Sequence, residues 1–249
     1  MAETWRELPP TLQGSSTSWV DSTLWAEGET ETSIQSSRRL YFASKRLIDI
    51  VGAALALILF SPVMLLIAIA IKLDSPGKVI FAQERMGYDP HTRKRRPFIM
   101  YKFRSMYQDC DQSAHRNYVK AWIRGDLEKN HEMKKLTNDH RVTRVGRILR
   151  KTSLDELPQF WNVLLGDMSL VGPRPVPLYE VAEYEPWHMK RLEATPGITG
   201  LWQVKGRGWV TLDEMANLDI EYIHRQSLGL DLAIILLTIP VMISRRGAA

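Results

Sequence analysis

The chain of 249 residues has little cysteine and no histidine pattern typical of a metal site. Cys110 is its only cysteine, so no disulfide can form within the chain. Its six histidines are scattered, without HxxxH or HExxH spacing, and we interpret each as an ordinary surface or core histidine. The first long apolar segment begins after residue 40 and lacks a small-residue cleavage pattern, so we do not expect a cleaved signal peptide there. These absences favour a domain that faces a reducing cytoplasm.

What the chain does contain is one uncharged apolar run, residues 50–71. At about 1.5 Å per residue, a helix of this length reaches roughly 33 Å, enough to cross a hydrocarbon core of about 30 Å. Ser61 and Pro62 interrupt the run at its centre, where the proline removes a helical hydrogen bond and the serine can satisfy a freed backbone group. Two structures stay open: a spanning helix with a proline kink, or two half-helices that enter one leaflet and turn back.

Basic residues flank the run on both sides. A spanning helix should show this bias on one side only, because positive charge marks the cytoplasmic side. The pattern therefore favours a re-entrant membrane helix over residues 38–73, broken at Ser61-Pro62, with both ends cytoplasmic. The flanking basic residues are Arg38, Arg39, Lys45 and Arg46 before the run, and Lys72, Lys78, Arg85 and residues 93–96 after it.

Residues 1–37 form a polar, acidic tail with six acidic residues and one basic residue, which leaves a net charge of about +10 on the rest of the chain. That positive remainder suits anionic lipid headgroups or phosphorylated substrates, and nothing in the pattern supports a nucleic acid partner. Trp5, Trp19 and Trp25 are unusual in a purely solvated segment. The tail either docks on the domain, a second subunit or the membrane interface, or stays loose.

The length and pattern of residues 74–249 predict that they form one cytoplasmic catalytic domain of α+β class, mainly helical. Short strands are expected at 79–83 and 98–103, around a basic loop at 89–97, which together form a small hairpin or sheet.

Three helical patterns follow in the same domain. Residues 105–136 read as an exposed, charged helical excursion. Residues 141–151 place apolar and basic side chains at helical spacing, which predicts a basic amphipathic helix. Its cationic face either binds phosphate or a lipid surface, or is only solvated. Residues 228–243 are apolar but contain Asp231, so an interfacial or core helix fits better than a second span.

The reactive chemistry is concentrated just after the basic helix, in residues 152–159. Asp155 and Glu156 are adjacent carboxylates near the start of the next helical pattern. Ser153 and Glu156 fit a capping box, whereas Pro158 would start the helix slightly later, and both structures stay open. The helix dipole and the preceding basic residues should keep both acids ionised. An ionised carboxylate can attack phosphorus or bind Mg²⁺, although acid pairs at helix starts are also common as capping groups.

Two loops rich in glycine and proline follow the acid pair. In the first, Pro173 and Pro175 fix the backbone around Arg174, whose fork of donors suits a phosphate or an internal salt bridge. The second, residues 196–208, offers backbone amides and further cations that include Arg207. Its glycine spacing is not that of a dinucleotide-binding loop.

Together these segments resemble the bacterial sugar transferases, the monotopic polyprenyl-phosphate phosphoglycosyl transferases that initiate polysaccharide assembly. The resemblance covers residues 45–248 and rests on motifs that occur in family order. These motifs are Lys45-Arg46 with Asp49, the Ser61-Pro62 break, residues 81–87 and 101–106, Asp155-Glu156, residues 173–175 and residues 196–207.

The resemblance implies an enzyme, a polyprenyl-phosphate hexose-1-phosphate transferase. It makes Asp155 the nucleophile on the sugar-bearing phosphate of a UDP-sugar, with release of UMP and a sugar-phosphoryl aspartate that polyprenyl (undecaprenyl) phosphate then attacks. Glu156 assists as a base or by positioning Mg²⁺, so Asp155 and Glu156 are also the expected metal ligands. Residues 200–204 look most like those of relatives that transfer glucose or galactose phosphate.

Seven side chains are expected to bind the substrates, mostly through phosphate. They are Arg150, Gln159, Arg174, Lys102, Arg104, Arg147 and Arg207.

The resemblance also places the protein at the cytoplasmic face of the bacterial inner membrane, in exopolysaccharide, capsule or O-antigen synthesis. The expected partners are a UDP-sugar, polyprenyl phosphate and membrane lipid, and a homodimer through residues 1–37 or 105–136 is a further expectation. A membrane-anchored, non-enzymatic scaffold would explain the charge and the apolar run, but not the acid pair or Arg174. A phosphatase with Asp155 as nucleophile is disfavoured, because the chain lacks the DxDx(T/V) loop of common aspartate-based phosphatases.

Overall fold

The computed structural model describes residues 31–90, 92–108, 110, 113–123, 139–206 and 211–244. The chain divides into two compact units, Met1–Leu40 and Tyr41–Ala249. The first helix, α1, begins at Glu31, inside the segment predicted as a tail. The rest of that predicted tail, with its tryptophans, lies outside the described residues.

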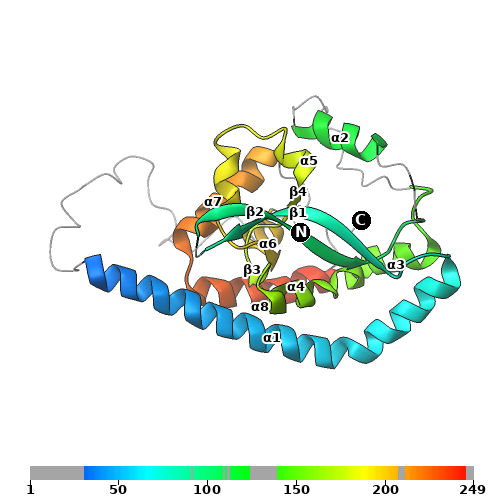
Figure 1. Ribbon diagram of the computed structural model, residues 1–249, viewed down its shortest axis with the longest axis horizontal. Coiled ribbons are helices and arrows are strands. Elements are labelled where there is room, and N and C mark those ends of the chain that lie inside the picture. The colour runs from blue at the N-terminus through cyan, green and yellow to red at the C-terminus, as the bar shows by residue number, and fades with distance from the viewer. Residues whose placement is uncertain are drawn as a thin grey trace, which may run out of the picture. The chain divides into compact units, whose positions relative to one another are not determined.

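Helix α1 (Glu31–Asp74) is continuous through the apolar run, and Figure 1 shows it bending in its second half. Pro62 has no N–H, so the carbonyl of Ile58 four residues earlier loses its helical donor. Ser61 Oγ donates to that carbonyl at 2.8 Å, which confirms the predicted role of the serine. The helix therefore continues through Ser61-Pro62 and bends in its second half, and its re-entrant course stays a prediction.

A three-stranded antiparallel sheet follows α1, with the order β2-β1-β4. Strands β1 (Ile80–Asp89) and β2 (Lys94–Phe103) form a hairpin, and β4 (Val176–Pro177) pairs with β1. The predicted hairpin is confirmed, but the predicted basic loop at 89–97 is too long, because β2 already begins at Lys94. The first four residues of β2 are exposed, so their basic side chains stay in solvent while the backbone pairs.

A second, parallel pair joins β3 (Ser169–Val171) to β5 (Gly197–Thr199). A Cβ atom on Gly197 would collide with the backbone of Gly172, so two glycines allow this close approach. The Gly172 N–H donates to the Thr199 carbonyl at 2.9 Å, and the Gly197 N–H donates to the Pro173 carbonyl at 2.8 Å. The Gly197 amide, in the loop predicted to offer amides to a ligand, is thus used inside the fold.

The remaining helices surround the two sheets and include the predicted basic helix, which is α3, and the predicted apolar helix, which is α8. The excursion predicted at 105–136 is helical over α2, and residues 124–136 lie outside the described residues. The bounds are α2 (Ser113–Ile123), α3 (Arg144–Thr152), η2 (Leu154–Glu156), α4 (Gln159–Leu165), α5 (Leu178–Val181), η3 (His188–Leu192), α6 (Leu201–Lys205), α7 (Leu212–Arg225) and α8 (Leu228–Ser244).

Both ends of the apolar run contribute buried residues to the domain core, whereas its middle contributes only partly buried contacts, from Phe60 and Met64. Ala53 belongs to a buried cluster with residues of β2 and α4, and Ile67 and Ile71 belong to another with residues of β2 and α3. No residue from 54 to 66 is buried. Burial of apolar surface therefore fixes α1 to the domain on either side of Pro62 and leaves the bend exposed.

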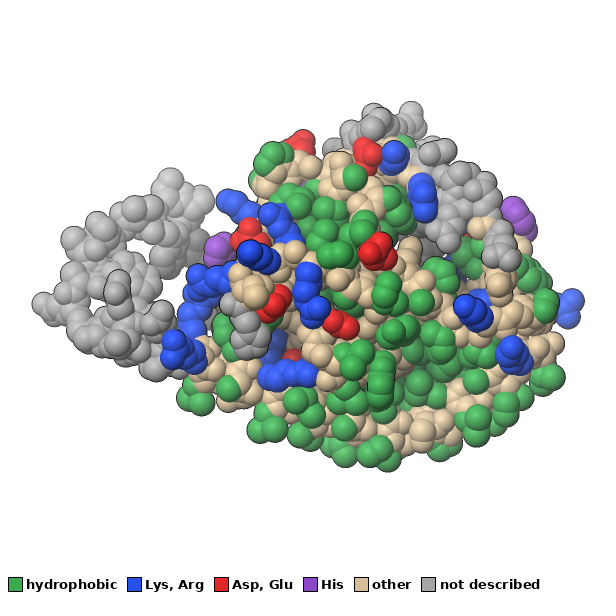
Figure 2. Space-filling model, in the orientation of Figure 1, with side chains coloured by type: hydrophobic (Ala, Val, Ile, Leu, Met, Phe, Trp, Pro, Cys, Tyr) green, Lys and Arg blue, Asp and Glu red, His purple; other side chains and the backbone are tan. Residues whose placement is uncertain are grey.

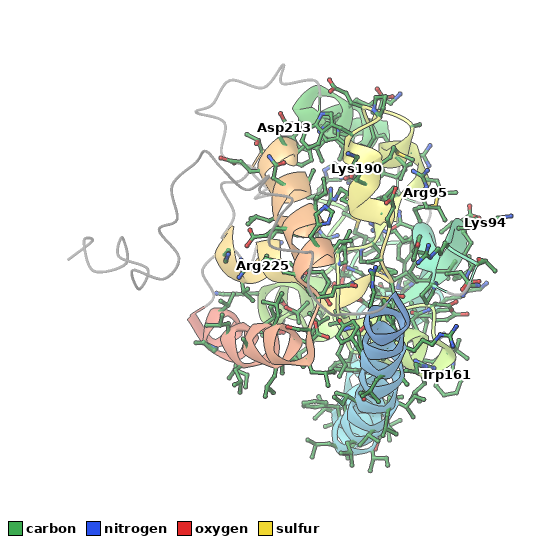
Figure 3. All side chains as sticks on the ribbon, turned by 90° about the vertical axis from the view of Figure 1, so that its left-hand side faces the viewer. Lys94, Arg95, Trp161, Lys190, Asp213 and Arg225 are labelled. Carbon is green, nitrogen blue, oxygen red and sulfur yellow. The ribbon has the colours of Figure 1, made fainter. Side chains whose placement is uncertain are left out.

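The exposed middle of α1 is part of a wider apolar surface. In Figure 2 hydrophobic side chains line the lower edge of the molecule, and in Figure 3 α8, α1 and the labelled Trp161 of α4 lie along that side. By length and composition the segment Arg38–Asp74 could cross a membrane, and an 18-residue window within it has a mean hydropathy of 2.8. Large exposed side chains of this surface include Leu55, Ile58, Leu59 and Leu66 of α1, Trp161 and Leu165 of α4, and Leu232, Leu236 and Leu237 of α8.

Candidate active site

The acid pair lies in a tight connection between two helices. Helix α3 ends at Thr152, and Ser153 turns the chain with left-handed backbone angles, φ 56° and ψ 16°. The 3₁₀ turn η2 then carries both acids, and α4 begins only after Pro158. Ser153 makes no side-chain capping bond, so the predicted capping box with Glu156 is wrong. The alternative, a later helix start at Pro158, is confirmed.

Glu156 is the centre of an ion-pair cluster. Its Oε1 accepts a hydrogen bond from Lys102 Nζ at 2.8 Å and another from Arg174 Nη2 at 3.1 Å. Burial alone would raise the pKa of Glu156, but the charges and hydrogen bonds of Lys102 and Arg174 outweigh it, and the pKa falls well below its usual range. Glu156 is therefore an ion at neutral pH and a poor proton acceptor.

Asp155 lies beside this cluster but is not bonded into it. The residue is 9% exposed, and its carboxylate makes no hydrogen bond or ion pair with any described residue. Burial raises its pKa, and so does the charge of Glu156, whereas Lys102, Arg150 and Arg174 lower it. The net direction is upward, opposite to that of Glu156. A carboxylate with uncommitted oxygen atoms near three cations is suited to attack an anionic phosphate.

Helix α3 directs its two predicted phosphate ligands differently. Arg150 is half-buried, its Nε donates to Ser105 Oγ at 2.9 Å, and its charge acts on Asp155. Arg147, almost one turn earlier, is exposed and contacts neither acid. The structure therefore brings Arg150 to the site and leaves Arg147 on the surface.

The other predicted ligands do not join the cluster in the same way. Arg104 is buried elsewhere: it donates to the Ser75 carbonyl at 2.7 Å and also to the Pro76 carbonyl, and so holds the turn after α1. It follows the last residue of β2, so strand alternation no longer places it beside the lysine two residues earlier. Gln159 is buried at the first position of α4. Arg207 lies outside the described residues.

Arg85 is a site residue that the sequence-based prediction missed. Its guanidinium donates to the Pro175 carbonyl at 3.1 Å and to Gln83 Oε1 at 2.6 Å. Burial lowers its pKa to about 10, and the neighbouring charge of Arg174 adds to the lowering. Its Nε is buried without a partner among the described residues. Two guanidinium groups of like charge close to each other are suited to an anion between them.

The acid pair offers limited but usable ligands for a divalent ion. Among the described residues, no group of three or more His, Cys, Asp or Glu side chains could hold a metal. Mg²⁺ usually takes one or two carboxylates and completes its six oxygen ligands from substrate phosphates and water. The free oxygens of Asp155 and Glu156 beside phosphate-binding cations fit that mode of binding, in which a diphosphate brings the remaining ligands.

A carboxylate with unbonded oxygen atoms beside three cationic side chains, on a domain packed against a long apolar helix, fits a membrane-associated phosphotransferase. The sequence model of one family, "Bacterial sugar transferase", matches residues 40–245. The chain belongs to this family. The family predicted from the ordered motifs is thereby confirmed, and with it the prediction of a transferase.

Curated relatives share much of the sequence. The chain is 42% identical over 213 residues to the galactosyl transferase CpsE of Streptococcus agalactiae, a match that covers 84% of this chain and 44% of the relative. It is 39% identical over 206 residues to the exopolysaccharide production protein ExoY of Rhizobium meliloti, covering 82% of this chain and 88% of that protein. It is 43% identical over 212 residues to the UDP-glucose:undecaprenyl-phosphate glucose-1-phosphate transferase of Caulobacter vibrioides, covering 82% and 71%. The chain thus spans less than half the length of some relatives and most of others.

Proposed function

We propose that the protein transfers a sugar 1-phosphate from a UDP-sugar, UDP-glucose or UDP-galactose, to undecaprenyl phosphate or a related polyprenyl phosphate, and releases UMP. The observation that carries this proposal is the unbonded Asp155 carboxylate beside Lys102, Arg150 and Arg174. The names of relatives support the acceptor and the donor class, since several are undecaprenyl-phosphate sugar phosphotransferases. The reaction is the first membrane step of polysaccharide assembly.

In the first half-reaction an Asp155 oxygen attacks the phosphorus that carries the sugar. A new bond forms between that oxygen and phosphorus, the bond from phosphorus to the bridging oxygen breaks, and UMP leaves with the electron pair. In the second, an oxygen of polyprenyl phosphate attacks the same phosphorus and the Asp155 carboxylate leaves. The product is a polyprenyl diphosphate sugar, and Asp155 returns to its starting state.

The surrounding cationic side chains bind the phosphate groups of the two substrates. Arg85 of β1 lies near Arg174, which belongs to the loop between β3 and β4. The charge of Arg150, on α3, acts on Asp155. Fixed positive groups of this kind stabilise charge that develops on the leaving UMP. When bound, Mg²⁺ would neutralise the diphosphate further, held by the free oxygens of the acid pair.

Glu156 serves better as a positioning residue and metal ligand than as a base. Its pKa is low because Lys102 and Arg174 bind it, and a carboxylate of low pKa accepts a proton weakly. The first half-reaction needs no proton transfer from Asp155, and the acceptor phosphate is already an anion at neutral pH. We therefore assign Glu156 to the placement of Lys102, Arg174 and the metal ion.

We propose further that α1 is re-entrant and that the domain lies on the cytoplasmic face of the inner membrane. Ala53 and Ile71 both pack on the same domain, so the two ends of the apolar run are held on one side of any bilayer that the bend enters. The exposed apolar side chains of α4 and α8 would rest at the same surface. This arrangement puts the acid pair within reach of a lipid phosphate and of a soluble nucleotide sugar.

A trapping experiment tests the chemistry. Purified protein in nanodiscs is incubated with Mg²⁺ and UDP-sugars labelled in the sugar, without polyprenyl phosphate. We expect one equivalent of UMP and a labelled protein for at least one sugar, and release of the label when polyprenyl phosphate is added. The Asp155→Asn variant should show neither, whereas Asp167→Asn, at a surface ion pair with Arg96, should behave as wild type. Labelling that persists in Asp155→Asn would remove the aspartate from the mechanism.

Cysteine labelling tests the topology. With Cys110 replaced by serine, single cysteines at positions 40 and 76 should both react with a membrane-impermeant maleimide from the cytoplasmic side. Labels on opposite faces would support the spanning helix instead. The absence of UMP release with every sugar would overturn the proposed reaction.

A further inference from the structure

A shallow depression of about 350 Å³ adjoins the phosphate-binding cations, and the reaction described above gives it no role. Phe81 and Gln83 of β1 line one side, and Arg116 of α2 with Leu178 and Tyr179 of α5 line the other. The depression therefore lies between β1, the strand that carries Arg85, and the helices α2 and α5.

Strand register connects the depression to the acid pair. Phe81 lies directly opposite Lys102 in the hairpin, and residues opposite each other in antiparallel strands point to the same face. Gln83 and Arg85 share that face, since side chains alternate along a strand. Arg85 in turn reaches the loop of Arg174 through the Pro175 carbonyl. The depression and the phosphate-binding groups thus form one continuous surface.

The groups in the depression suit a flat heteroaromatic ring. The Arg116 guanidinium lies over the Tyr179 ring, 5.2 Å from its centre, and Phe81 is 38% exposed. Aromatic rings and guanidinium planes are the surfaces on which nucleobases stack in proteins. The oxygen of the Gln83 amide accepts from Arg85, which leaves its NH₂ group to donate to a carbonyl oxygen.

We propose that this depression binds the pyrimidine base of the nucleotide donor. The inference rests on the proposed function, in which the donor is a UDP-sugar. The sugar is attached to the phosphorus that Asp155 attacks, so it lies on the Asp155 side of the diphosphate. The base lies beyond the other phosphate, and the depression adjoins Arg85 along β1, on the sheet face that also carries Lys102. Phe81 and the Arg116–Tyr179 pair then enclose the base, and Gln83 donates to one of its carbonyl oxygens.

Direct binding of UMP tests this assignment, because UMP contains the base and one phosphate but no transferred sugar. Titration calorimetry on the full chain in nanodiscs should show UMP bound about tenfold or more weakly by Tyr179→Ala, as expected for the loss of one stacking partner. Arg116→Ala should weaken binding by a smaller factor, and Tyr179→Phe, which keeps the ring, should bind as wild type. Lys94→Ala is the matched control for loss of one positive charge, since Lys94 lies at the opposite end of the hairpin from Phe81.

A second ligand separates base recognition from phosphate recognition. The affinity for inorganic diphosphate should be the same in Tyr179→Ala and wild type. If Tyr179→Ala does not fold, Arg116→Ala and Phe81→Leu carry the same test. Unchanged UMP affinity with a raised KM for the UDP-sugar would assign the depression to the sugar and overturn the proposal, as would wild-type protein that binds no UMP.

The two proposals fail in different ways. Wild-type protein that binds UMP through Tyr179, but releases UMP from no UDP-sugar, would refute the proposed reaction and leave the base site standing. Wild-type protein that turns over, with full UMP affinity in Tyr179→Ala and Arg116→Ala, would refute the base site alone.

Discussion

Two buried clusters of opposite charges lie in this domain, and they differ in how many oxygen atoms are already bonded. At Asp231 of α8, Oδ1 accepts from Tyr222 at 2.7 Å, and Oδ2 accepts from Lys45 at 2.9 Å and from Tyr41 at 3.0 Å. Lys45 also donates to the Val171 carbonyl at 2.9 Å. Both carboxylate oxygens are paired, and the cluster fastens α1 to α7, α8 and β3.

The cluster at the acid pair is the opposite case. Glu156 binds two cations through a single oxygen, and Asp155 binds none directly. Arg85 keeps a buried nitrogen atom without a partner among the described residues. A buried acid is therefore no sign of reactivity by itself, since Asp231 is as buried as Asp155. What distinguishes the site is charge left unpaired by the fold, which a substrate can pair.

The largest expected effect separates chemistry from stability at Asp155. The Asp155→Asn variant should lose more than about 10³-fold in turnover, because the amide cannot act as the nucleophile. Its thermal stability should be unchanged or higher. The raised pKa of Asp155 means that the folded state disfavours its ionised form, so this group stabilises the fold only at low pH and opposes it as the pH rises through the folded pKa.

UMP release and thermal unfolding at pH 7 check both halves of this prediction. A large drop in stability would show that Asp155 is paired in the protein after all.

Asp231→Ala should show the reverse pattern. Removing one partner of a buried ion pair leaves the other charge uncompensated, at a cost of about 3–5 kcal/mol in the free energy of unfolding. The double variant Lys45→Met/Asp231→Leu should recover part of this loss, since it removes both charges together. Urea unfolding in detergent measures the difference. Equal destabilisation by the single and double variants would argue against pairing as the source of the effect.

Lys102→Met should lower the stability of the fold at neutral pH, by less than Asp231→Ala does, and should have less effect at low pH. The depressed pKa of Glu156 means that its contribution is fully present above the unfolded pKa of about 4.3 and is lost as pH falls toward the folded value. The variant should therefore be less stable than wild type by about 1–3 kcal/mol at pH 7, from loss of a charged hydrogen bond. The difference should shrink below about pH 4. Unfolding curves from pH 3 to 8 test this, with Lys102→Arg as the control that keeps the charge.

The smallest effect is expected at the bend of α1. Ser61→Ala leaves the Ile58 carbonyl without its hydroxyl donor and should cost about 0.5–1.5 kcal/mol. Ser61→Ala/Pro62→Ala should recover the loss, because alanine at position 62 supplies the backbone N–H that proline lacks. Thermal unfolding in nanodiscs compares the two. A double variant no better than the single one would mean that the hydroxyl bond does not stabilise the bend.

Local patterns in the sequence were sufficient for the elements that depend on local forces. Pro158 marked the start of α4, Ser61 was expected to serve a freed backbone group, and the apolar and basic spacing marked α3. The predicted start of β2 was too late, because the basic residues 93–96 were assigned to a loop. Exposed strand positions accept charged side chains as readily as a loop does.

Contacts between distant segments could not be predicted in the same way. Lys102 and Arg104 look equivalent in sequence, but β2 ends between them, so one reaches Glu156 and the other reaches Ser75. Arg85 could have been found by extending the first strand, since its alternation with Phe81 places it on the face of Lys102. The glycines of residues 196–208 suggested free amides, although the parallel pairing of β3 with β5 uses them.

The ion pair between Lys45 and Asp231 can form only after both α1 and α8 have been synthesised. Its two residues are 186 positions apart in the chain. At about 5–20 residues per second, roughly 10–40 s pass between the synthesis of α1 and that of its partner on α8. Through that interval Lys45 has no carboxylate partner on α8. The ion pair that fastens α1 to α8 therefore forms only after α8 has been made.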